Sequence, residues 1–269
     1  NRFPMWGSPL TDQRTVFFLW HGHALFCGRV RDNTAHRHHA LQVVVGLQRA
    51  FGLHDGRRWQ QTRAAVIAPD HPHRIDGAGG PLWLLLVEPE WPHVRGLADT
   101  LRGSKAVRFP EPQGLIAAAR PERVAERVSC AGAREAADRV LTLLEAAPRQ
   151  ACAPPDPRVA KALSLMRASE GRRAAAADLA RRVHLSASRL AHLFKDQVGI
   201  PMRRYLLWLR LIAAVRAMLA PASFTTAAHA AGFADAAHLS RTFRRMFGLR
   251  PSDVLKDSQF VQAFLCERP

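Results

Sequence analysis

Two segments near the end of this 269-residue chain repeat the same order of residues. Each has a small polar residue, a leucine, a phenylalanine and a glycine, and every member recurs 49 residues later. They are Ser186, Leu190, Phe194 and Gly199 in the first segment and Asp235, Leu239, Phe243 and Gly248 in the second. Ser and Asp are favoured at helix N-caps, and apolar residues four apart lie on one helix face. The repeat predicts two copies of one helical unit.

The first segment has the dimensions of a helix-turn-helix unit. A short helix that includes Ala180 precedes a tight turn at residues 183–185, and a second helix begins at Ser186. A small residue such as Ala180 lets the two helices cross closely. In the second segment the alanines 227–228 take this place and Gly232 allows the sharp turn. We therefore expect two helix pairs of the same design.

The predicted outer faces of the second helices are polar and basic. In the first unit this face carries Arg189 and Lys195, and in the second it carries Arg241. Such a helix can enter the major groove of DNA, where polar side chains reach base edges and cations reach phosphates. A plain helical bundle with a solvated basic face would explain the amphipathic helices equally well. It would not explain why cap, leucine, phenylalanine and glycine recur in register.

The spacing of the two units fits one face of a DNA duplex. The segment 202–219 between them has eighteen residues, or about 27 Å of helix at 1.5 Å per residue. A DNA turn is roughly 34 Å long, so the two helices could reach adjacent segments of the major groove.

The net charge of +17 is concentrated in this part of the chain. Residues 158–269 hold 19 Lys and Arg against 7 Asp and Glu, whereas residues 1–157 hold 20 against 15. A basic surface binds phosphate backbones through counterion release, so nucleic acid is the first partner to consider. An Ala- and Arg-rich composition would raise the charge too, and the geometry has to support the assignment.

The helical region resembles the DNA-binding domain of AraC/XylS-type transcription regulators. The matching residues are Leu179, Ala180, Ser186, Leu190, Phe194, Lys195, Gly199, Pro201, Tyr205, Arg210, Leu211, Gly232, Phe233, Leu239, Ser240, Phe243, Phe247, Gly248 and Pro251. The resemblance implies two helix-turn-helix units joined by a long helix, promoter DNA and RNA polymerase as partners, and often an effector-binding, dimerising cupin-like β-barrel in the first half.

The resemblance also implies which residues contact DNA. Base-reading roles fall on Ser188, Ala191 and His192 in the first unit and on Ala237, His238 and Arg241 in the second. Further candidates for DNA contact on the same helices are Ser186, Arg189, Lys195, Ser240, Arg244 and Arg245. Ala191, Ala236 and Ala237 stand where longer polar side chains are common in the family. DNA shape and contacts with thymine methyl groups would therefore contribute a larger share of the sequence specificity. Arg241 is the strongest candidate for base reading, because arginine on guanine is the commonest specific contact.

Short β-rich runs dominate the first half of the chain. The predicted strands cover residues 15–20, 24–30, 39–47, 62–69 and 81–89, with a hairpin signal at Asp55-Gly56. Many short strands without a helical period favour an antiparallel barrel or sandwich, and the resemblance favours a cupin-like barrel. The helix predicted over residues 133–147 has an apolar stripe that packs either on this barrel or on a second subunit.

We therefore expect an α+β protein of two domains. The predicted bounds are 1–147 for a cupin-like effector-binding and dimerisation domain, 148–157 for a Pro-rich linker, and 158–269 for the DNA-binding domain. The two helix-turn-helix units would lie at about residues 177–196 and 225–248. A homodimer is the expected assembly.

Histidines gather in two stretches of the first half. His36, His38 and His73 could share one face of the barrel, with Gln42 where a cupin carboxylate ligand would stand. Three interpretations stay open: a divalent-metal site at His36, His38 and His73, a pocket for a small organic effector, or a purely structural core. The predicted effector pocket comprises His36, His38, Gln42, Trp59, His73 and Trp83.

Other features bear on location and chemistry. We find no signal peptide and no long apolar run, and we interpret Cys27, Cys130, Cys152 and Cys266 as reduced thiols of a cytoplasmic protein. No nucleophile-base pair, phosphate loop or paired carboxylates indicate an enzyme.

The alternatives to a specific regulator are a metal-binding cupin, as sensor or enzyme, fused to the helical domain, and a non-specific architectural DNA binder. Whether such a regulator activates or represses stays open.

Overall fold

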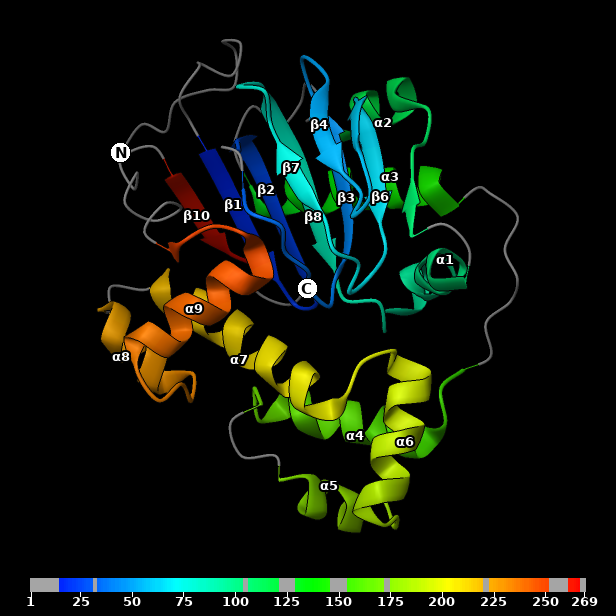
Figure 1. The fold of residues 1–269 in the computed structure, drawn as a ribbon, viewed down its shortest axis with the longest axis vertical. Helices are drawn as coiled ribbons and strands as arrows, with labels where there is room; N and C mark the ends of the chain where they lie inside the picture. The colour runs from blue at the N-terminus through cyan, green and yellow to red at the C-terminus, as the bar shows by residue number, and fades with distance from the viewer. Residues whose placement is uncertain are drawn as a thin grey trace. The chain divides into compact units, whose positions relative to one another are not determined.

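The structure is a computed structural model that describes residues 15–30, 33–103, 106–120, 129–145, 154–171, 175–219, 223–251 and 261–266 (Figure 1). It divides into two compact units: residues 1–151 together with 244–269, hereafter the sheet unit, and residues 152–243, hereafter the helical unit. Most of the predicted Pro-rich linker, residues 148–153, lies outside the described residues. The domain bounds expected from the sequence stay a prediction.

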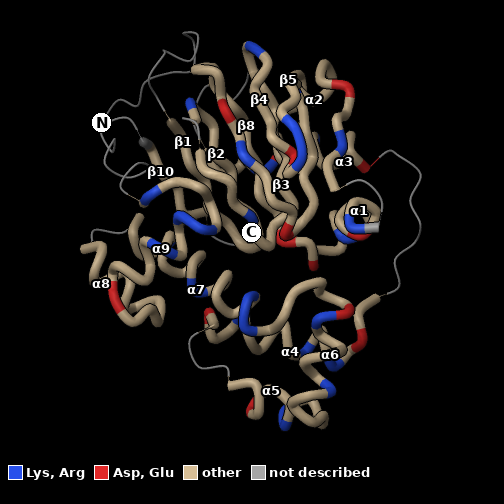
Figure 2. The backbone as a smooth tube through the Cα atoms, in the orientation of Figure 1, with Lys and Arg blue, Asp and Glu red and all other residues tan. Residues whose placement is uncertain are grey.

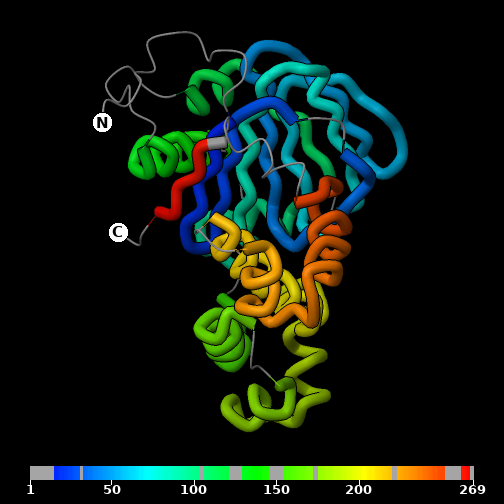
Figure 3. Tube along the Cα trace, turned by 90° about the vertical axis from the view of Figure 1, so that its left-hand side faces the viewer, coloured from blue at the N-terminus to red at the C-terminus, as the bar shows by residue number. Residues whose placement is uncertain are grey.

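A seven-stranded sheet forms the centre of the sheet unit (Figure 1). Its order is β10 (Val261–Leu265), β1 (Thr15–Trp20), β2 (His23–Arg29), β8 (Pro81–Val87), β3 (Leu41–Gly46), β6 (Ala64–Ile67) and β9 (Val107–Arg108). Neighbouring strands are antiparallel, except that β10 runs parallel to β1. Figure 3 shows β10, from the far end of the chain, beside β1. The sequence did not indicate this strand.

A second sheet packs on one face of the first. It consists of β5 (Trp59–Thr62), β4 (Phe51–His54) and β7 (Arg74–Asp76). Alternation along each strand sends Phe51 and Leu53 towards Val44 and Ile67 of the large sheet, and these residues form a shared apolar core. The predicted hairpin at Asp55-Gly56 is confirmed: β4 pairs with β5, and the Asp55 carboxylate accepts hydrogen bonds from two loop amides at 2.9 Å.

The expectation of a closed barrel is corrected by this topology. The described strands form two separate open sheets, which is the sandwich alternative. The large sheet does not close because the outer edge of β1 pairs with β10, while β6 pairs with the short β9 at the other side. Closure would require these edges to pair with each other.

Three helices cover the other face of the large sheet (Figure 1). They are α1 (Pro92–Gly103), α2 (Pro112–Ala119) and α3 (Cys130–Glu145). Of the apolar stripe predicted in α3, Ala136, Val140 and Leu144 are buried in this core, whereas Leu143 is 48% exposed. The stripe thus packs mainly on its own sheet, and dimerisation stays a prediction.

The prediction that all four cysteines are reduced thiols is wrong for two of them. Cys130 at the start of α3 forms a disulfide with Cys266 after β10, with their Cα atoms 5.5 Å apart. These residues are 136 positions apart in the sequence, and only the pairing of β10 with β1 brings them together. Cys27 is a free buried thiol, and burial raises its pKa to about 12. Cys152 lies outside the described residues.

The helical unit begins at α4 and contains most of the predicted helices. They are α4 (Pro157–Ala168), α5 (Ala176–Arg182), α6 (Ala187–Val198), α7 (Met202–Met218), α8 (Phe224–Ala230) and α9 (Ala236–Phe247), of which the last turn belongs to the sheet unit. Fully buried Phe194 and Tyr205 lie at the centre of its core, with ring centroids 5.6 Å apart. None of the helices described combines the length and the apolar character needed to span a bilayer.

The disulfide predicts a redox-dependent stability. Reduction of the wild-type protein should lower the free energy of unfolding by about 2–5 kcal/mol, because the bond restricts a long loop in the unfolded chain. Urea denaturation with and without a thiol reductant measures this difference. Cys130→Ala should be as unstable as reduced wild type and insensitive to reductant, whereas Cys27→Ala, the matched control, should keep the wild-type response. Equal stability of oxidised and reduced wild type would contradict the disulfide assignment.

Candidate nucleic-acid interface and histidine cluster

The helix pair α5–α6 has the features predicted for the first unit. The Ser186 hydroxyl caps α6 by accepting a hydrogen bond from the Arg189 amide at 3.2 Å. Leu190 and Phe194 are fully buried, and Gly199 ends the helix with φ of 84°, in the left-handed region. The buried pair turns one face of α6 inward, so the opposite face lies in solvent.

The pair α8–α9 repeats this design. The Asp235 carboxylate caps α9 by accepting a hydrogen bond from the His238 amide at 2.6 Å. Leu239 and Phe243 are buried, and Gly248 ends α9 with φ of 72°. The repeat read from the sequence is therefore a structural repeat of cap, inward face and helix end.

The two turns differ by one residue. In the first, the amide of Leu185 donates to the carbonyl of Ala180 at 3.0 Å, and in the second the amide of Phe233 donates to that of Ala228 at 2.9 Å. These bonds are 48 positions apart, whereas the capped helices are 49 apart. The extra residue lies between Phe233 and the Asp235 cap, so the second turn is longer although the helices are equivalent.

The predicted DNA-contacting residues of α6 all lie in solvent. Exposed side chains are Ser186, Ser188, Arg189, Ala191, His192 and Lys195. Nε2 of His192 also lies 3.3 Å from a carboxylate oxygen of Asp196, one helical turn on. Contact with a phosphate or a base by His192 would compete with this pair, whereas Arg189 and Lys195 have exposed charges available for an anion.

The predicted DNA-contacting residues of α9 differ in their solvent exposure. Ala237, Arg241, Arg244 and Arg245 are exposed, whereas His238 and Ser240 are half-buried. The ring of His238 packs edge-on against Phe233, with centroids 5.2 Å apart. Within the described ranges Arg241, Arg244 and Arg245 have no ion-pair partner, and Figure 2 shows the basic positions of α6 and α9. Three exposed guanidinium groups on one helix favour an anionic partner.

The connecting helix α7 matches the predicted spacer. It has 17 residues, or about 26 Å at 1.5 Å per residue, against the eighteen residues expected. Met202, Tyr205, Trp208 and Leu211 are buried, so α7 belongs to the core of the helical unit. It is a rigid connection between the two helix pairs.

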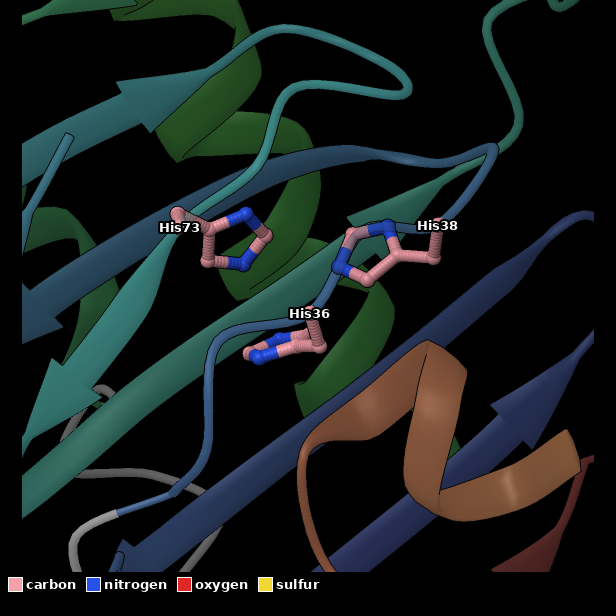
Figure 4. Close-up of side chains that lie close together, drawn as sticks. All are labelled: His36, His38 and His73. Carbon is pink, nitrogen blue, oxygen red and sulfur yellow. The ribbon is translucent and has the colours of Figure 1, made fainter. Parts of the chain in front are cut away.

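The sheet unit gathers three buried histidines. His36, in the connection from β2 to β3, pairs with His73, just before β7, through two backbone hydrogen bonds of 2.9 Å. His38 lies two residues further on, and each of the three rings offers a ligand atom within 4.8 Å of the others. Figure 4 shows the rings around a common space. The sequence prediction that these side chains meet is confirmed by this geometry, although they sit between connections rather than inside a barrel.

Burial keeps these histidines neutral near pH 7. It lowers the pKa of His36 to about 4 and that of His38 to about 3, and it lowers the pKa of His73 well below the ordinary value. For His38 and His73 the neighbouring rings add to this effect, because a second positive charge nearby is unfavourable.

Gln42 belongs to the same cluster, but the two tryptophans do not. The Gln42 Oε1 atom lies 2.6 Å from Nε2 of His38 and 3.2 Å from Nε2 of His73. Trp83 projects into the core beneath the helices, on the opposite face of the large sheet from Gln42. Trp59 is 47% exposed on β5 and packs against His54 and Arg74. The six residues proposed for an effector pocket therefore do not form one site.

Sequence reasoning missed the neighbours of this cluster. Thr34 donates two hydrogen bonds to the carbonyl of Gly248, from its amide at 3.0 Å and its hydroxyl at 3.1 Å. The ring of Phe247 lies 6.2 Å from that of His38, centroid to centroid. These partners are more than 200 positions apart, and no local pattern links them. The sequence pointed to Gly248 only as the last member of the repeat and as one of the residues that carry the family resemblance.

Comparisons with known proteins identify the helical part. A family model described as a helix-turn-helix domain matches residues 179–257. No curated protein matches the chain. Among solved structures, ToxT from Vibrio cholerae O395 is 13% identical with a TM-score of 0.57, covering 88% of this chain and 98% of that one. ToxT from Vibrio cholerae strain SCE256 with bound unsaturated fatty acid is 11% identical with a TM-score of 0.56, covering 87% and 94%.

A third solved structure is similar over the helical part alone. It is a transcriptional regulator of Chromobacterium violaceum, described as an AraC-type DNA-binding domain-containing protein. The two chains are 31% identical, with a TM-score of 0.35 and coverage of 38% of this chain and 91% of that one. The ToxT structures share the two-part fold, a sheet-rich part followed by a helical part. The chain belongs to the AraC-type DNA-binding transcription regulators, with their helix-turn-helix domain at residues 179–257.

Proposed function

We propose that this protein binds specific promoter sequences as double-stranded DNA, with α6 and α9 entering two adjacent segments of the major groove. The observation that carries this proposal is the repeated unit itself: two capped helices, each with a buried leucine and phenylalanine and an exposed basic face. The rigid α7, about 26 Å long, supports contact with both segments by one chain.

The exposed residues divide into two proposed roles. Base contacts are assigned to Ser188, Ala191 and His192 on α6 and to Ala237, His238 and Arg241 on α9. Phosphate and sugar contacts are assigned to Ser186, Arg189, Lys195, Ser240, Arg244 and Arg245. His238 is half-buried against Phe233, so its polar reach is limited and Arg241 carries most of the direct reading on α9.

The sheet unit is proposed to sense a small ligand. Support comes from its polar cluster in a sandwich of two sheets, and from the ToxT structure with bound unsaturated fatty acid, which has a similar fold at low identity. Ligand binding would raise the population of those protein conformations that can bind DNA, and the ligand itself would not be chemically converted. We further propose that the protein acts on RNA polymerase in the cytoplasm as a homodimer. A likeness to cupins is proposed only for the connections that carry His36, His38 and His73.

Arg241→Ala should selectively weaken binding to the preferred DNA sequence. Loss of one arginine contact to a guanine costs about 1–3 kcal/mol, roughly 5- to 150-fold in affinity. Fluorescence anisotropy with a fragment enriched by wild-type protein from genomic DNA, and with a scrambled fragment, separates specific from general loss. Arg57→Ala, in the exposed β4–β5 loop, removes the same charge and should leave both affinities unchanged. Equal loss on both fragments would contradict base reading by Arg241.

Lys195→Ala should act on every DNA sequence alike. Lys195 is exposed on α6, and a lysine on a phosphate adds to affinity without reading bases. The plot of log affinity against log salt should lose about one unit of slope, with the ratio of specific to scrambled affinity unchanged. An unaltered slope would remove Lys195 from the proposed phosphate contacts.

A further inference from the structure

The histidine cluster has the donor set of a metal site and lies against the residue that ends α9. We propose that His36, His38, His73 and Gln42 bind a divalent first-row transition-metal ion, and that this ion strengthens DNA binding by ordering the C-terminal end of α9. The metal site concerns the sheet unit alone. The effect on DNA rests on the proposed function above.

Hydrogen bonds determine which ring nitrogens carry a proton. The Nδ1 atoms of His36, His38 and His73 lie 2.9, 3.1 and 2.9 Å from the backbone carbonyls of residues 34, 40 and 71. A carbonyl only accepts, and we therefore assign the ring proton of each histidine to Nδ1. A neutral imidazole has a single proton, which leaves a lone pair on each Nε2. Metal-binding histidines are held in this way, with one ring N–H on a backbone carbonyl.

Gln42 brings a hydrogen-bond acceptor to two of these ring nitrogens. Its Oε1 atom, an acceptor, faces the Nε2 lone pairs of His38 and His73, while its own Nε2 is buried with no hydrogen-bond partner among the described residues. If the Gln42 amide were rotated by half a turn, its NH₂ group would offer two donors to the three ring nitrogens. Its oxygen would then lie at the buried position that has no hydrogen-bond partner among the described residues. One cation among the three rings would accept a lone pair from each ring and from Oε1.

The donor set indicates the class of metal. Three imidazoles and one amide oxygen suit zinc, nickel, copper or iron, whereas calcium and magnesium require oxygen ligands. Zinc takes ring nitrogens at about 2.0–2.1 Å in a tetrahedral site, so the rings have to draw closer by about an ångström. Their ligand atoms are already within 4.8 Å of one another, and side-chain rotation supplies such a movement.

One glycine connects this cluster to α9. A Cβ atom on Gly248 would lie 2.4 Å from the carbonyl oxygen of Thr34 and 2.8 Å from Nδ1 of His36. That same Thr34 oxygen accepts the hydrogen bond that orients His36. The carbonyl of Gly248 in turn accepts both hydrogen bonds from Thr34. The end of α9 and the ring of His36 thus share one hydrogen-bonded backbone segment, within the sheet unit.

Through the contact of Gly248 with Thr34 and His36, metal binding at the cluster can restrain the last turn of α9. The amide of Gly248 donates to the carbonyl of Arg244 at 2.8 Å, and Phe247 packs near His38. An ion that fixes the rings of His36 and His38 also restrains Phe247 and Gly248, and with them the backbone that carries Arg244 and Arg245. A helix end that is already ordered loses less conformational entropy when it binds DNA. The ion and DNA therefore bind with positive cooperativity.

Zinc binding to the full chain tests the site directly. Protein freed of metal by a chelator is titrated with Zn²⁺ at pH 7 by calorimetry, and bound zinc is counted by elemental analysis. We expect one ion per chain in the wild type, loss of that ion in His73→Gln, and retention in the matched control His54→Gln on β4. Gln42→Glu replaces the amide with a charged oxygen ligand and should bind zinc more tightly.

These results have clear contrary outcomes. No zinc bound by the wild type, or a His73→Gln protein that binds as tightly as the wild type, overturns the site. If His73→Gln fails to fold by circular dichroism, the comparison of wild type with Gln42→Glu decides, and equal zinc affinity of these two overturns it.

DNA affinity with and without zinc tests the coupling. Anisotropy with the enriched fragment should show wild-type binding at least about fivefold tighter with zinc than with chelator. Gly248→Ala should lose this difference, because its new Cβ displaces the Thr34–His36 segment that joins the cluster to α9. Gly199→Ala is the matched control: it has the same left-handed helix end on α6 and should keep the difference. An unchanged or weaker affinity with zinc overturns the coupling.

Failure of the two proposals can be told apart. If no DNA fragment is preferred either with zinc or with chelator, the proposed DNA-binding function fails, while the zinc titration still judges the metal site. If DNA is bound specifically and zinc has no effect, the function stands and the coupling fails.

Discussion

Burial of both faces of β3 is the constraint on which the sheet unit depends. Every residue from Leu41 to Gly46 is buried, with Val43 and Val45 under the helices and Val44 against the second sheet. A polar residue in such a strand has to find partners, since an unpaired amide in an apolar core costs several kcal/mol at the upper end of transfer estimates. Gln42 is that residue. Three histidine rings lie around it, and its Oε1 atom is 2.6 Å from Nε2 of His38 and 3.2 Å from Nε2 of His73.

The sequence predicted the local elements well because their signals are local. Caps at Ser186 and Asp235, inward leucine and phenylalanine residues, and the final glycines are each decided within one or two helical turns, and the structure has them all. The pairing of β10 with β1, the Cys130–Cys266 bond and the opening of the expected barrel into two sheets depend on partners far away in the chain. Periodicity shows that a strand exists, but not which edge it joins.

The candidate site divides in the same way. Exposure of the basic residues on α6 and α9 follows from the inward face, which the sequence shows. His36 and His38 were placed together correctly because a spacing of two puts them on one side of an extended segment. The grouping of Trp83 with these histidines was wrong. Alternation along β8 places its side chain on the face of the large sheet opposite to Gln42, under the helices. The sequence does not show which face of a strand the helices cover and which the second sheet covers.

The glycines that end α6 and α9 are equivalent in the sequence repeat, yet they meet different surroundings. Both need the left-handed conformation to stop a helix, so either would be read as an ordinary C-terminal cap. Gly248 has a second requirement, because the carbonyl of Thr34 occupies the place of a side chain. A residue selected by helix termination alone tolerates asparagine, whereas one that also meets a backbone atom at 2.4 Å from its Cβ position tolerates glycine only. The repeat thus conceals an asymmetry: of two equal helix ends, only the second is built into the sheet unit.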